Sequence, residues 1–213
     1  MFEYNTQAIV LDKDTINEAD ANVILYTENL GKIELIAKGA KKITAKLNAH
    51  LEPLNLIEAT IIAANNKHLT SVLTINNFYR IRKNYLLLEN ALKMLKLFNQ
   101  AIVANEKDEL IWQALNNYLN NLNSEKLSQM EGQKMLILMK LFNLEFLFNL
   151  TKALGMMPDF EEINRHFSQQ TVFLIKLLES ENPQNILEKF ELSKLEKIDY
   201  NKIENEIKQK III

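Results

Sequence analysis

The chain has 213 residues, of which 47% are hydrophobic and 24% charged, and its formal net charge is −2 at pH 7. This composition is typical of a globular protein, and the scarcity of glycine (4) and proline (3) argues against long flexible linkers. The absence of cysteine excludes disulfides, thiolate metal ligands and a cysteine nucleophile.

The first part of the chain contains five short runs with the alternation and β-branched content of strands. In KIELIAK (32–38), Ile33, Leu35 and Ala37 are expected to share the buried face. Gly31 is suited to a tight turn that needs positive φ, and Asn65–Lys67 is predicted to form a hairpin turn. The predicted strands are 6–11, 22–27, 32–38, 54–64 and 68–75. Five strands with a longer third connection indicate a small closed barrel such as an OB-fold.

From about residue 79 the hydrophobic period changes to that of helices. The segment 85–104 places Leu88, Leu92, Leu95 and Phe98 or Asn99 on one stripe, and the segment 109–122 does the same with Ile111, Leu115, Tyr118 and Leu122. Ser124 is predicted to cap a long helix through the apolar run 135–150 to Leu154, with Gly155 as its C-terminal stop. Further helices are predicted at 168–179, 184–190 and 200–210. The fold class is therefore α+β, with a barrel domain at 1–79 and an all-helical domain at 80–213.

No motif for catalysis or cofactor binding is present. His50, His68 and His166 lie in three different elements without metal-ligand spacing. The sequence has neither a glycine-rich phosphate loop nor a nucleophile elbow. We therefore expect a non-enzyme that holds no metal and no cofactor. The N-terminus lacks a signal-peptide pattern, and no stretch reaches the roughly 18 apolar residues of a membrane span, so we expect a cytoplasmic protein without membrane contact.

A lysine cluster follows the third predicted strand. Lys32, Lys38, Lys41, Lys42 and Lys46 are accompanied by a single acid, Glu34. A solubilising loop is one interpretation of such a run. Its place on an OB-type barrel favours binding to nucleic acid, because these barrels bind single strands across one face and its loops. Arg80, Arg82 and Lys83 add positive charge at the domain junction, where Phe78 and Tyr79 are either stacking surface or core.

The chain resembles the RecO family of bacterial recombination mediators along most of its length. The residues that carry the resemblance are TQAIVLDKDTINEADANVILYTENLGKIELIAKGAKK (6–42), LNAHLEPLNLIEA (47–59) and NLEFLFNLTKALGMMPD (143–159). Many members carry a four-cysteine zinc module after the L-G-x-x-P step. Here Ile163 and His166 stand about where a first cysteine pair would fall, so the resemblance implies a short, zinc-free version.

The resemblance implies an OB-fold that binds single- and double-stranded DNA without sequence preference and anneals complementary strands. It also implies help in loading RecA onto single strands coated by single-strand-binding protein (SSB), with RecR and the SSB C-terminal tail as partners, and a cytoplasmic, nucleoid-associated location. The predicted phosphate contacts are Lys32, Lys38, Lys41, Lys42, Lys46, Arg80, Arg82 and Lys83.

The helical domain is the predicted docking surface for partners. The SSB tail requires an apolar pocket with a basic residue at its mouth for the terminal carboxylate, and Lys140, Lys152 and Arg165 border the apolar helix region. Each of them is also explained as an ordinary surface charge. An alternative from another class is a non-catalytic scaffold whose lysines only solubilise it, which the net acidity supports.

Overall fold

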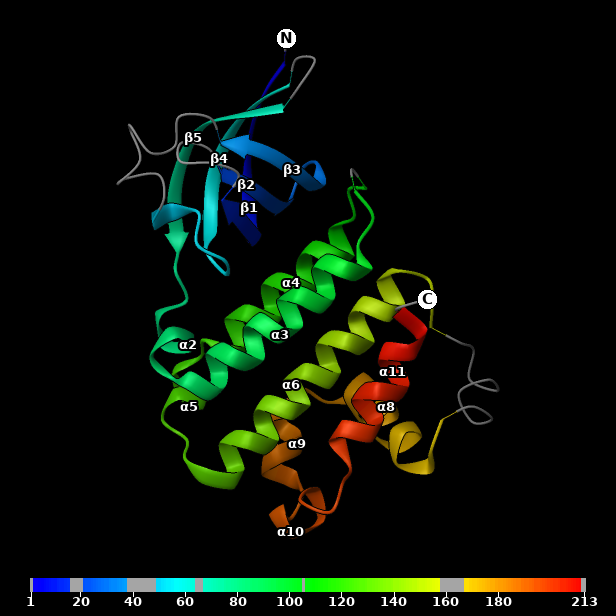
Figure 1. Cartoon of the computed structure of the whole chain (residues 1–213). Coiled ribbons are helices and arrows are strands. Elements are labelled where there is room, and N and C mark those ends of the chain that lie inside the picture. Colours follow the sequence, from blue (N-terminus) through cyan, green and yellow to red (C-terminus); the bar gives the residue numbers. More distant parts are fainter. Residues whose placement is uncertain are drawn as a thin grey trace. The chain divides into compact units, whose positions relative to one another are not determined.

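The computed structural model describes residues 2–15, 21–37, 49–63, 67–104, 106–157 and 167–211. The chain divides into two compact units, which we call unit 1 (Met1–Trp112) and unit 2 (Gln113–Ile213). Unit 1 holds all the strands and the first helices, whereas unit 2 is helical (Figure 1). The division falls inside helix α4 (Glu109–Leu122), so each unit holds part of that helix.

Unit 1 is built on a five-stranded antiparallel sheet in the order β3-β2-β1-β4-β5. The long first strand pairs with β2 along one part and with β4 along another, and β3 and β5, at the two ends of the order, lie next to each other. The sheet therefore curls into a barrel (Figure 1), which confirms the predicted OB-type fold. The strands are β1 (Phe2–Thr15), β2 (Ala21–Thr27), β3 (Gly31–Ala37), β4 (Leu56–Ala63) and β5 (Lys67–Asn76). The predicted turn residues Asn65 and Asn66 lie outside the described residues.

The inside of the barrel is filled by alternate residues of its strands. Ile33 and Leu35 are buried as predicted, while Glu34 and Ile36 between and beyond them are exposed. The apolar core also takes residues from β1, β2, β4, β5 and the turn before β4: Ala8, Val10, Ala21, Val23, Leu25, Leu51, Ile57, Ala59, Ile61 and Val72. Such alternation is what one buried face of a pleated strand requires.

A second apolar layer lies on the outer face of β1 and β2. Ile9 and Tyr26 are cross-strand partners and are both fully buried. Helix α3 (Tyr85–Ala101) packs on β1. The Tyr26 ring meets Phe98 of α3 edge-on at 5.0 Å between centroids and stacks on Trp112 at 6.4 Å. Burial of large aromatic rings stabilises such layers strongly, so α3 belongs to the same compact unit as the barrel.

The two compact units meet inside α4, after Trp112, and the predicted domain boundary between residues 79 and 80 stays a prediction. Short helix α2 (Tyr79–Lys83) packs on α3, and α3 packs on β1. The division between the units comes after Trp112, because the rings of Phe98 and Trp112 both pack on Tyr26 of strand β2. The helices that precede residue 112 are therefore part of the unit that carries the barrel.

The turn from β2 into β3 is built around Gly31. Its φ is +66°, as the sequence predicted for this connection. A Cβ at this position would also lie 2.1 Å from the backbone oxygen of Glu106. Glycine is thus required here for its conformation and for the close approach of a second segment.

Unit 2 is organised around the long helix α6 (Gly132–Ala153), which packs against α5, α9 and α11. Residues on most sides of α6 are buried, which confirms that the run 135–150 is a core helix. The remaining helices are α5 (Glu125–Ser128), α8 (Gln169–Ser180), α9 (Pro183–Lys189), α10 (Leu192–Leu195) and α11 (Tyr200–Ile211). Among the described residues, no helix is both long enough and apolar enough to span a membrane.

The ends of α6 show one error and one success of the sequence prediction. Ser124 caps only the four-residue helix α5, by accepting a hydrogen bond from the backbone N–H of Leu127. Gly132 has φ of +60°, which prevents one continuous helix from Ser124 to Leu154. Gly155 ends α6 as predicted: its N–H bonds to the Lys152 carbonyl while Met156 N–H bonds to that of Thr151, the pattern of a Schellman motif.

The predicted helical stripes were correct for α4 and partly wrong for α3. Ile111, Leu115, Tyr118 and Leu122 are all buried. In α3 the buried residues are Leu87, Ala91, Met94, Leu95, Leu97 and Phe98, whereas Leu92 is exposed. Helix α3 is apolar on two neighbouring stripes, and only its packing on the barrel decides which of them is buried.

Candidate nucleic-acid and partner-docking sites

Most of the predicted lysine cluster lies outside the described residues. Lys38, Lys41, Lys42 and Lys46 fall in the segment 38–48, which joins the end of β3 to the turn before β4. The described residues on either side of the segment show how its two ends are held. Phosphate contact by these four lysines stays a prediction.

Lys32, the first lysine of the cluster, is engaged with the end of helix α3. Its ammonium donates hydrogen bonds to the backbone oxygens of Asn99 at 2.5 Å and Ile102 at 3.1 Å. Loss of solvent lowers the pKa of the half-buried Lys32 side chain, and the nearby Glu34 carboxylate opposes that shift. A cation at a helix C-terminus satisfies carbonyls that have no partner within the helix and interacts favourably with the helix dipole. Lys32 therefore links β3 to α3 within unit 1.

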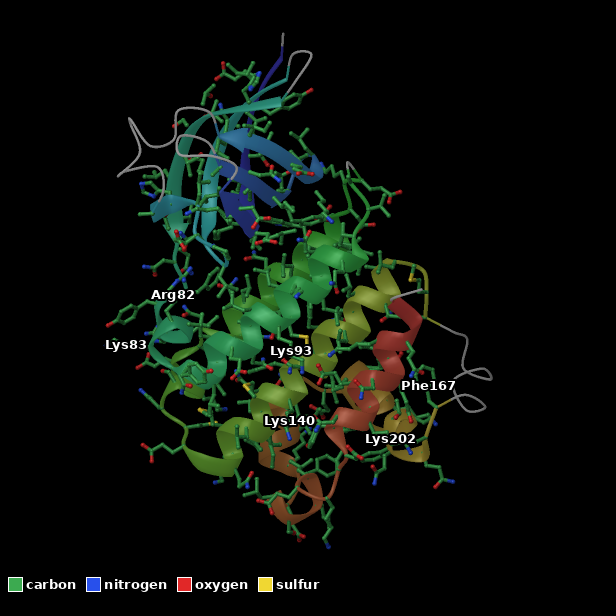
Figure 2. The ribbon with its side chains drawn as sticks, in the orientation of Figure 1. Arg82, Lys83, Lys93, Lys140, Phe167 and Lys202 are labelled. Atoms are coloured by element: carbon green, nitrogen blue, oxygen red, sulfur yellow. The ribbon has the colours of Figure 1, made fainter. Side chains whose placement is uncertain are left out.

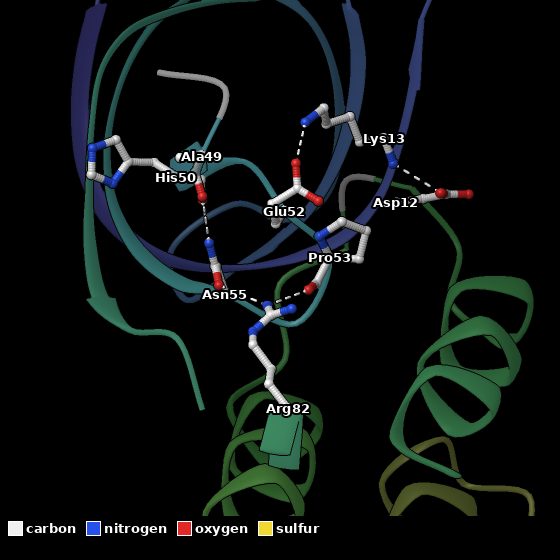
Figure 3. Close-up of polar contacts among 8 residues, drawn as sticks. All are labelled: Asp12, Lys13, Ala49, His50, Glu52, Pro53, Asn55 and Arg82. Carbon is white, nitrogen blue, oxygen red and sulfur yellow. Dashed lines mark hydrogen bonds and ion pairs between the residues drawn. The ribbon is translucent and has the colours of Figure 1, made fainter. Parts of the chain in front are cut away.

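Arg82 on α2 makes a comparable link to the other end of the lysine segment (Figure 3). Its Nε donates to the Asn77 oxygen at 2.7 Å, and one terminal nitrogen donates to the Pro53 oxygen and to Asn55 Oδ1, both at 2.8 Å. Partial burial lowers the pKa of the guanidinium, although Glu52 acts in the opposite direction. The rigid fork of an arginine is suited to binding several acceptors at once. Arg82 thus holds the turn 51–55 against α2.

Asn55 is the centre of this turn, and the sequence analysis missed it. Its side-chain nitrogen donates to the backbone oxygens of Ala49 at 3.1 Å and His50 at 2.9 Å, while its oxygen accepts from Arg82. Figure 3 shows Asn55 between the backbone at 49–50 and the guanidinium. Asn55 is itself buried. Asn55 stands two residues after Pro53 of the L-x-P segment. Its partners Ala49 and His50 are close in the sequence, but Arg82, which donates to its oxygen, is 27 residues further along the chain.

The start of the turn carries two further contacts. Lys13 on β1 forms an ion pair with Glu52 at 2.7 Å (Figure 3). His50 accepts at Nδ1 from the Thr74 backbone N–H at 3.2 Å and lies 2.7 Å from the Thr74 hydroxyl. These contacts support a structural role for His50, which lacks metal-ligand spacing in the sequence. The C-terminal end of the lysine segment is therefore attached to β1, β5 and α2.

The remaining predicted basic residues of unit 1 are on the exposed side of α2. Arg80 and Lys83 are exposed, and the Lys83 ammonium lies 4.6 Å from the centroid of the exposed Tyr79 ring. Phe78 is fully buried with φ of +50°, so it is core and does not offer a stacking surface. Figure 2 shows Arg82 and Lys83 on α2. Of the two aromatic residues at this junction, Tyr79 is the one available to a base.

In unit 2, Lys140 borders a pocket of about 220 Å³. The apolar side chains of Leu136, Ile137 and Ile198 line it together with Gln133, Glu196 and Tyr200. The Lys140 ammonium lies 5.4 Å from the centroid of the Tyr200 ring. The Tyr200 hydroxyl is buried without a hydrogen-bond partner among the described residues, and burial raises its pKa. A mainly polar pocket with a cation, three apolar side chains and an unused donor is suited to an anionic group that carries apolar atoms.

The other two predicted docking residues are not part of this pocket. Lys152 is exposed in the last turn of α6, and Arg165 lies outside the described residues. Tyr200 is a pocket residue that sequence reasoning missed. The signal was weak, because a tyrosine at the start of a helix reveals neither its burial nor the state of its hydroxyl.

The described residues contain no group of three or more histidine, aspartate or glutamate side chains that could hold a metal ion. The region of Ile163 and His166, where family resemblance places a zinc module, lies outside them.

The comparisons with known proteins identify the family of unit 1. A family model described as the N-terminal part of recombination protein O matches residues 1–78, the barrel and its connections. The chain is also similar to the DNA repair protein RecO of Thermodesulfovibrio yellowstonii, with 29% identity over 181 residues, 81% of this chain. Residues 1–78 therefore belong to the RecO N-terminal family, and similarity to a RecO protein extends over most of the chain.

Other RecO relatives match shorter parts of the chain. The protein of Dehalococcoides mccartyi is 35% identical over 38% of this chain, and that of Acetivibrio thermocellus is 29% identical over 55%. Both are also named DNA repair protein RecO. The matches cover 68% of the T. yellowstonii RecO but only 33% and 46% of the other two.

Proposed function

We propose that this protein is a member of the RecO family and acts in DNA repair as a recombination mediator. It binds single- and double-stranded DNA without sequence preference, anneals complementary strands and helps RecA load onto SSB-coated single strands. The observation that supports this most is the match of residues 1–78 to the RecO N-terminal family, on a barrel whose third connection carries four lysines. RecR and the SSB tail are the proposed partners, and the role is non-catalytic.

Two groups of basic residues have different tasks in this proposal. Lys38, Lys41, Lys42 and Lys46 contact phosphates, supported by the exposed Arg80 and Lys83 of α2. Lys32 already donates to backbone carbonyls at the end of α3, and Arg82 to the Pro53 carbonyl in the turn before β4, so these two residues act by holding the barrel elements that flank the segment. Lysine suits such contacts because a flexible point charge accepts any sequence.

Salt dependence and a paired substitution test the DNA surface. If roughly 4 phosphates of a single strand are neutralised, the slope of log affinity against log salt is about −3, or about 50-fold between 50 and 200 mM salt. Lys41→Ala with Lys42→Ala should reduce this slope and weaken binding, as measured by fluorescence anisotropy on single-stranded DNA. Lys194→Ala with Lys197→Ala, two exposed lysines of unit 2, is the matched control. A flat salt response, or equal effects of the two pairs, contradicts the proposal.

The pocket beside Lys140 is the proposed docking site for the SSB tail. Apolar side chains and the Lys140 ammonium suit a peptide that ends in an apolar residue and a carboxylate. The buried Tyr200 hydroxyl could donate to the same carboxylate, while Glu196 at the pocket disfavours a second negative charge there.

A tail peptide with a free C-terminus and the same peptide with an amidated C-terminus separate these contributions. Lys140→Ala and amidation should each weaken binding about tenfold, which corresponds to one charge-assisted hydrogen bond. Lys152→Ala is the control on the same helix. Equal binding of both peptides to the unmodified protein would exclude this pocket as the carboxylate site.

The second candidate function is a scaffold whose lysines only solubilise it. An electrophoretic shift with single-stranded DNA at low salt distinguishes the two functions, since the scaffold gives no shift. Annealing of complementary strands by the same preparation, with and without RecR, then tests the mediator role itself.

A further inference from the structure

A second pocket, of about 270 Å³, lies between α4 and α6 in unit 2. It is lined mainly by one carboxylate, three carboxamides and two aromatic rings: Glu145, Asn117, Asn121, Asn149, Tyr118 and Phe146. Glu145 stands within the apolar run 135–150 that the sequence predicted to be a buried helix. In the structure it is the single charged residue of this pocket.

The Glu145 carboxylate lacks a compensating charge. It accepts a long hydrogen bond of 3.4 Å from the Asn121 side-chain nitrogen. Burial raises the pKa of Glu145 to about 7, which the bond from Asn121 partly offsets. Within the described ranges it takes part in no ion pair. A bound cation would supply the missing charge and favour the ionised carboxylate.

The two rings form an aromatic wall. Tyr118 and Phe146 stack with their centroids 4.6 Å apart and an angle of 24° between planes. The Tyr118 hydroxyl already donates to Asn143 Oδ1 at 3.0 Å, and both rings are almost fully buried, so they form the floor of the pocket. The face of an aromatic ring attracts cations, and arginine in particular stacks on it.

The carboxamides of Asn117 and Asn149 complete the site at its exposed side. Both residues are exposed, and neither side chain makes a hydrogen bond within the part of the chain that the structure describes. Their oxygens can accept hydrogen bonds from a group that carries several donors. The pocket therefore combines a carboxylate and amide acceptors above a buried aromatic floor.

We propose that this pocket binds an arginine side chain presented by a partner protein. A guanidinium offers five donors in a plane, which matches a carboxylate with neighbouring amide oxygens and can lie along a ring. Lysine would use the carboxylate but not the planar acceptors. A nucleotide would bring its phosphates close to an ionised carboxylate, which disfavours it. None of the residues that line this pocket belongs to the barrel or to the Lys140 pocket, so this inference does not rest on the DNA-binding proposal.

The test uses the full chain and the peptide Gly-Gly-Arg-Gly-Gly with both ends blocked. The matched probe replaces arginine by citrulline, which has nearly the same shape without the charge. Binding is followed by NMR through the side-chain amide signals of Asn117, Asn121 and Asn149. The arginine peptide should shift these signals with saturation, and the citrulline peptide should bind at least tenfold more weakly, because a charge-assisted bond is lost.

Two variants identify the residue responsible. Glu145→Gln keeps the shape and an acceptor oxygen but removes the charge, so it should weaken arginine binding at least tenfold and abolish the preference over citrulline. Glu179→Gln, an exposed glutamate of α8, should leave both affinities unchanged. The proposal is overturned if the arginine peptide does not saturate, if the Glu145→Gln protein still prefers arginine, or if a mononucleotide displaces the peptide.

Discussion

The two units differ in how their half-buried charged side chains are paired, although unit 1 also has one buried acceptor, Asn99 Oδ1, without a hydrogen-bond partner among the described residues. In unit 1, the half-buried cations are used to hold the fold together: Lys32 binds two carbonyls at the end of α3, and Arg82 binds three acceptors around the turn before β4. In unit 2, Glu145 and the Tyr200 hydroxyl are buried beside pockets with few partners or none. A satisfied buried group stabilises the structure, whereas an unsatisfied one leaves binding capacity for a ligand.

This difference changes which residues are the best targets for functional experiments. A cation that already has two or three acceptors is a poor choice for testing DNA contact, since its loss damages the fold. The exposed cations of α2 and the lysines of 38–48 are better choices in unit 1. In unit 2 the informative residues are those that line the two pockets.

The largest expected effect comes from Gly31→Ala. The new alanine would have to adopt φ of +66°, and its Cβ would lie 2.1 Å from the backbone oxygen of Glu106. We therefore expect the free energy of unfolding to fall by about 3 to 4 kcal/mol. Urea unfolding followed by the fluorescence of Trp112, the single tryptophan, reports on unit 1.

Gly155→Ala is the matched control in unit 2. Gly155 has the same φ of +66°, but nothing lies within 4 Å of its added Cβ. Only the cost of the left-handed conformation remains, about 1 kcal/mol, measured by circular dichroism. Equal losses for the two substitutions would show that the contact with Glu106 contributes nothing.

Arg82→Ala is expected to reduce the free energy of unfolding of unit 1 by about 3 kcal/mol, because the Pro53 oxygen and Asn55 Oδ1 lose their donor. Arg82→Lys should recover only part of this loss, since an ammonium does not reproduce the fork. Lys83→Ala, whose side chain is exposed, should change stability by less than about 0.5 kcal/mol. If Arg82→Ala leaves the free energy of unfolding unchanged but lowers DNA affinity, Arg82 contacts DNA and does not hold the turn.

The smallest expected effect is the pH dependence caused by Glu145. Its pKa in the folded state, about 7, lies above the ordinary value of 4.5, so the folded state holds this proton more tightly than the unfolded one. The free energy of unfolding should therefore fall as pH rises from 4.5 to 7, by about 2 kcal/mol after allowance for partial solvent screening.

The difference between the protein and its Glu145→Gln variant isolates this contribution. Thermal unfolding of both at pH 5 and pH 8 should show that the variant gains relative stability at the higher pH. Asn117 and Asn121 of α4, which line the same pocket, carry no charge. The difference in pH dependence between the two proteins therefore comes from the Glu145 carboxylate. A pH-independent difference would mean that Glu145 is well solvated and that the pocket is less enclosed than the structure indicates.

Local patterns in the sequence predicted most of the framework. Alternation in β3 correctly placed Ile33 and Leu35 inside, and the 3.6-residue period of α4 correctly placed Tyr118 and Leu122. Gly31 and Gly155 were predicted from their turn and stop positions. These signals succeed because the period of a strand or helix and the need for positive φ are properties of a short segment. The stripe of α3 failed because two apolar stripes compete and only its partner selects one.

The sequence by itself determined the barrel, the helical second half and the family, since these follow from local periodicity and from the motifs around the lysine segment. Only the tertiary structure decided that Lys32 and Arg82 bind backbone carbonyls, and that Glu145 and Tyr200 are buried beside pockets. The physical reason is that a polar side chain's role depends on the acceptors and the solvent around it. Those are supplied by residues far away in sequence, such as Asn99 for Lys32 and Pro53 for Arg82.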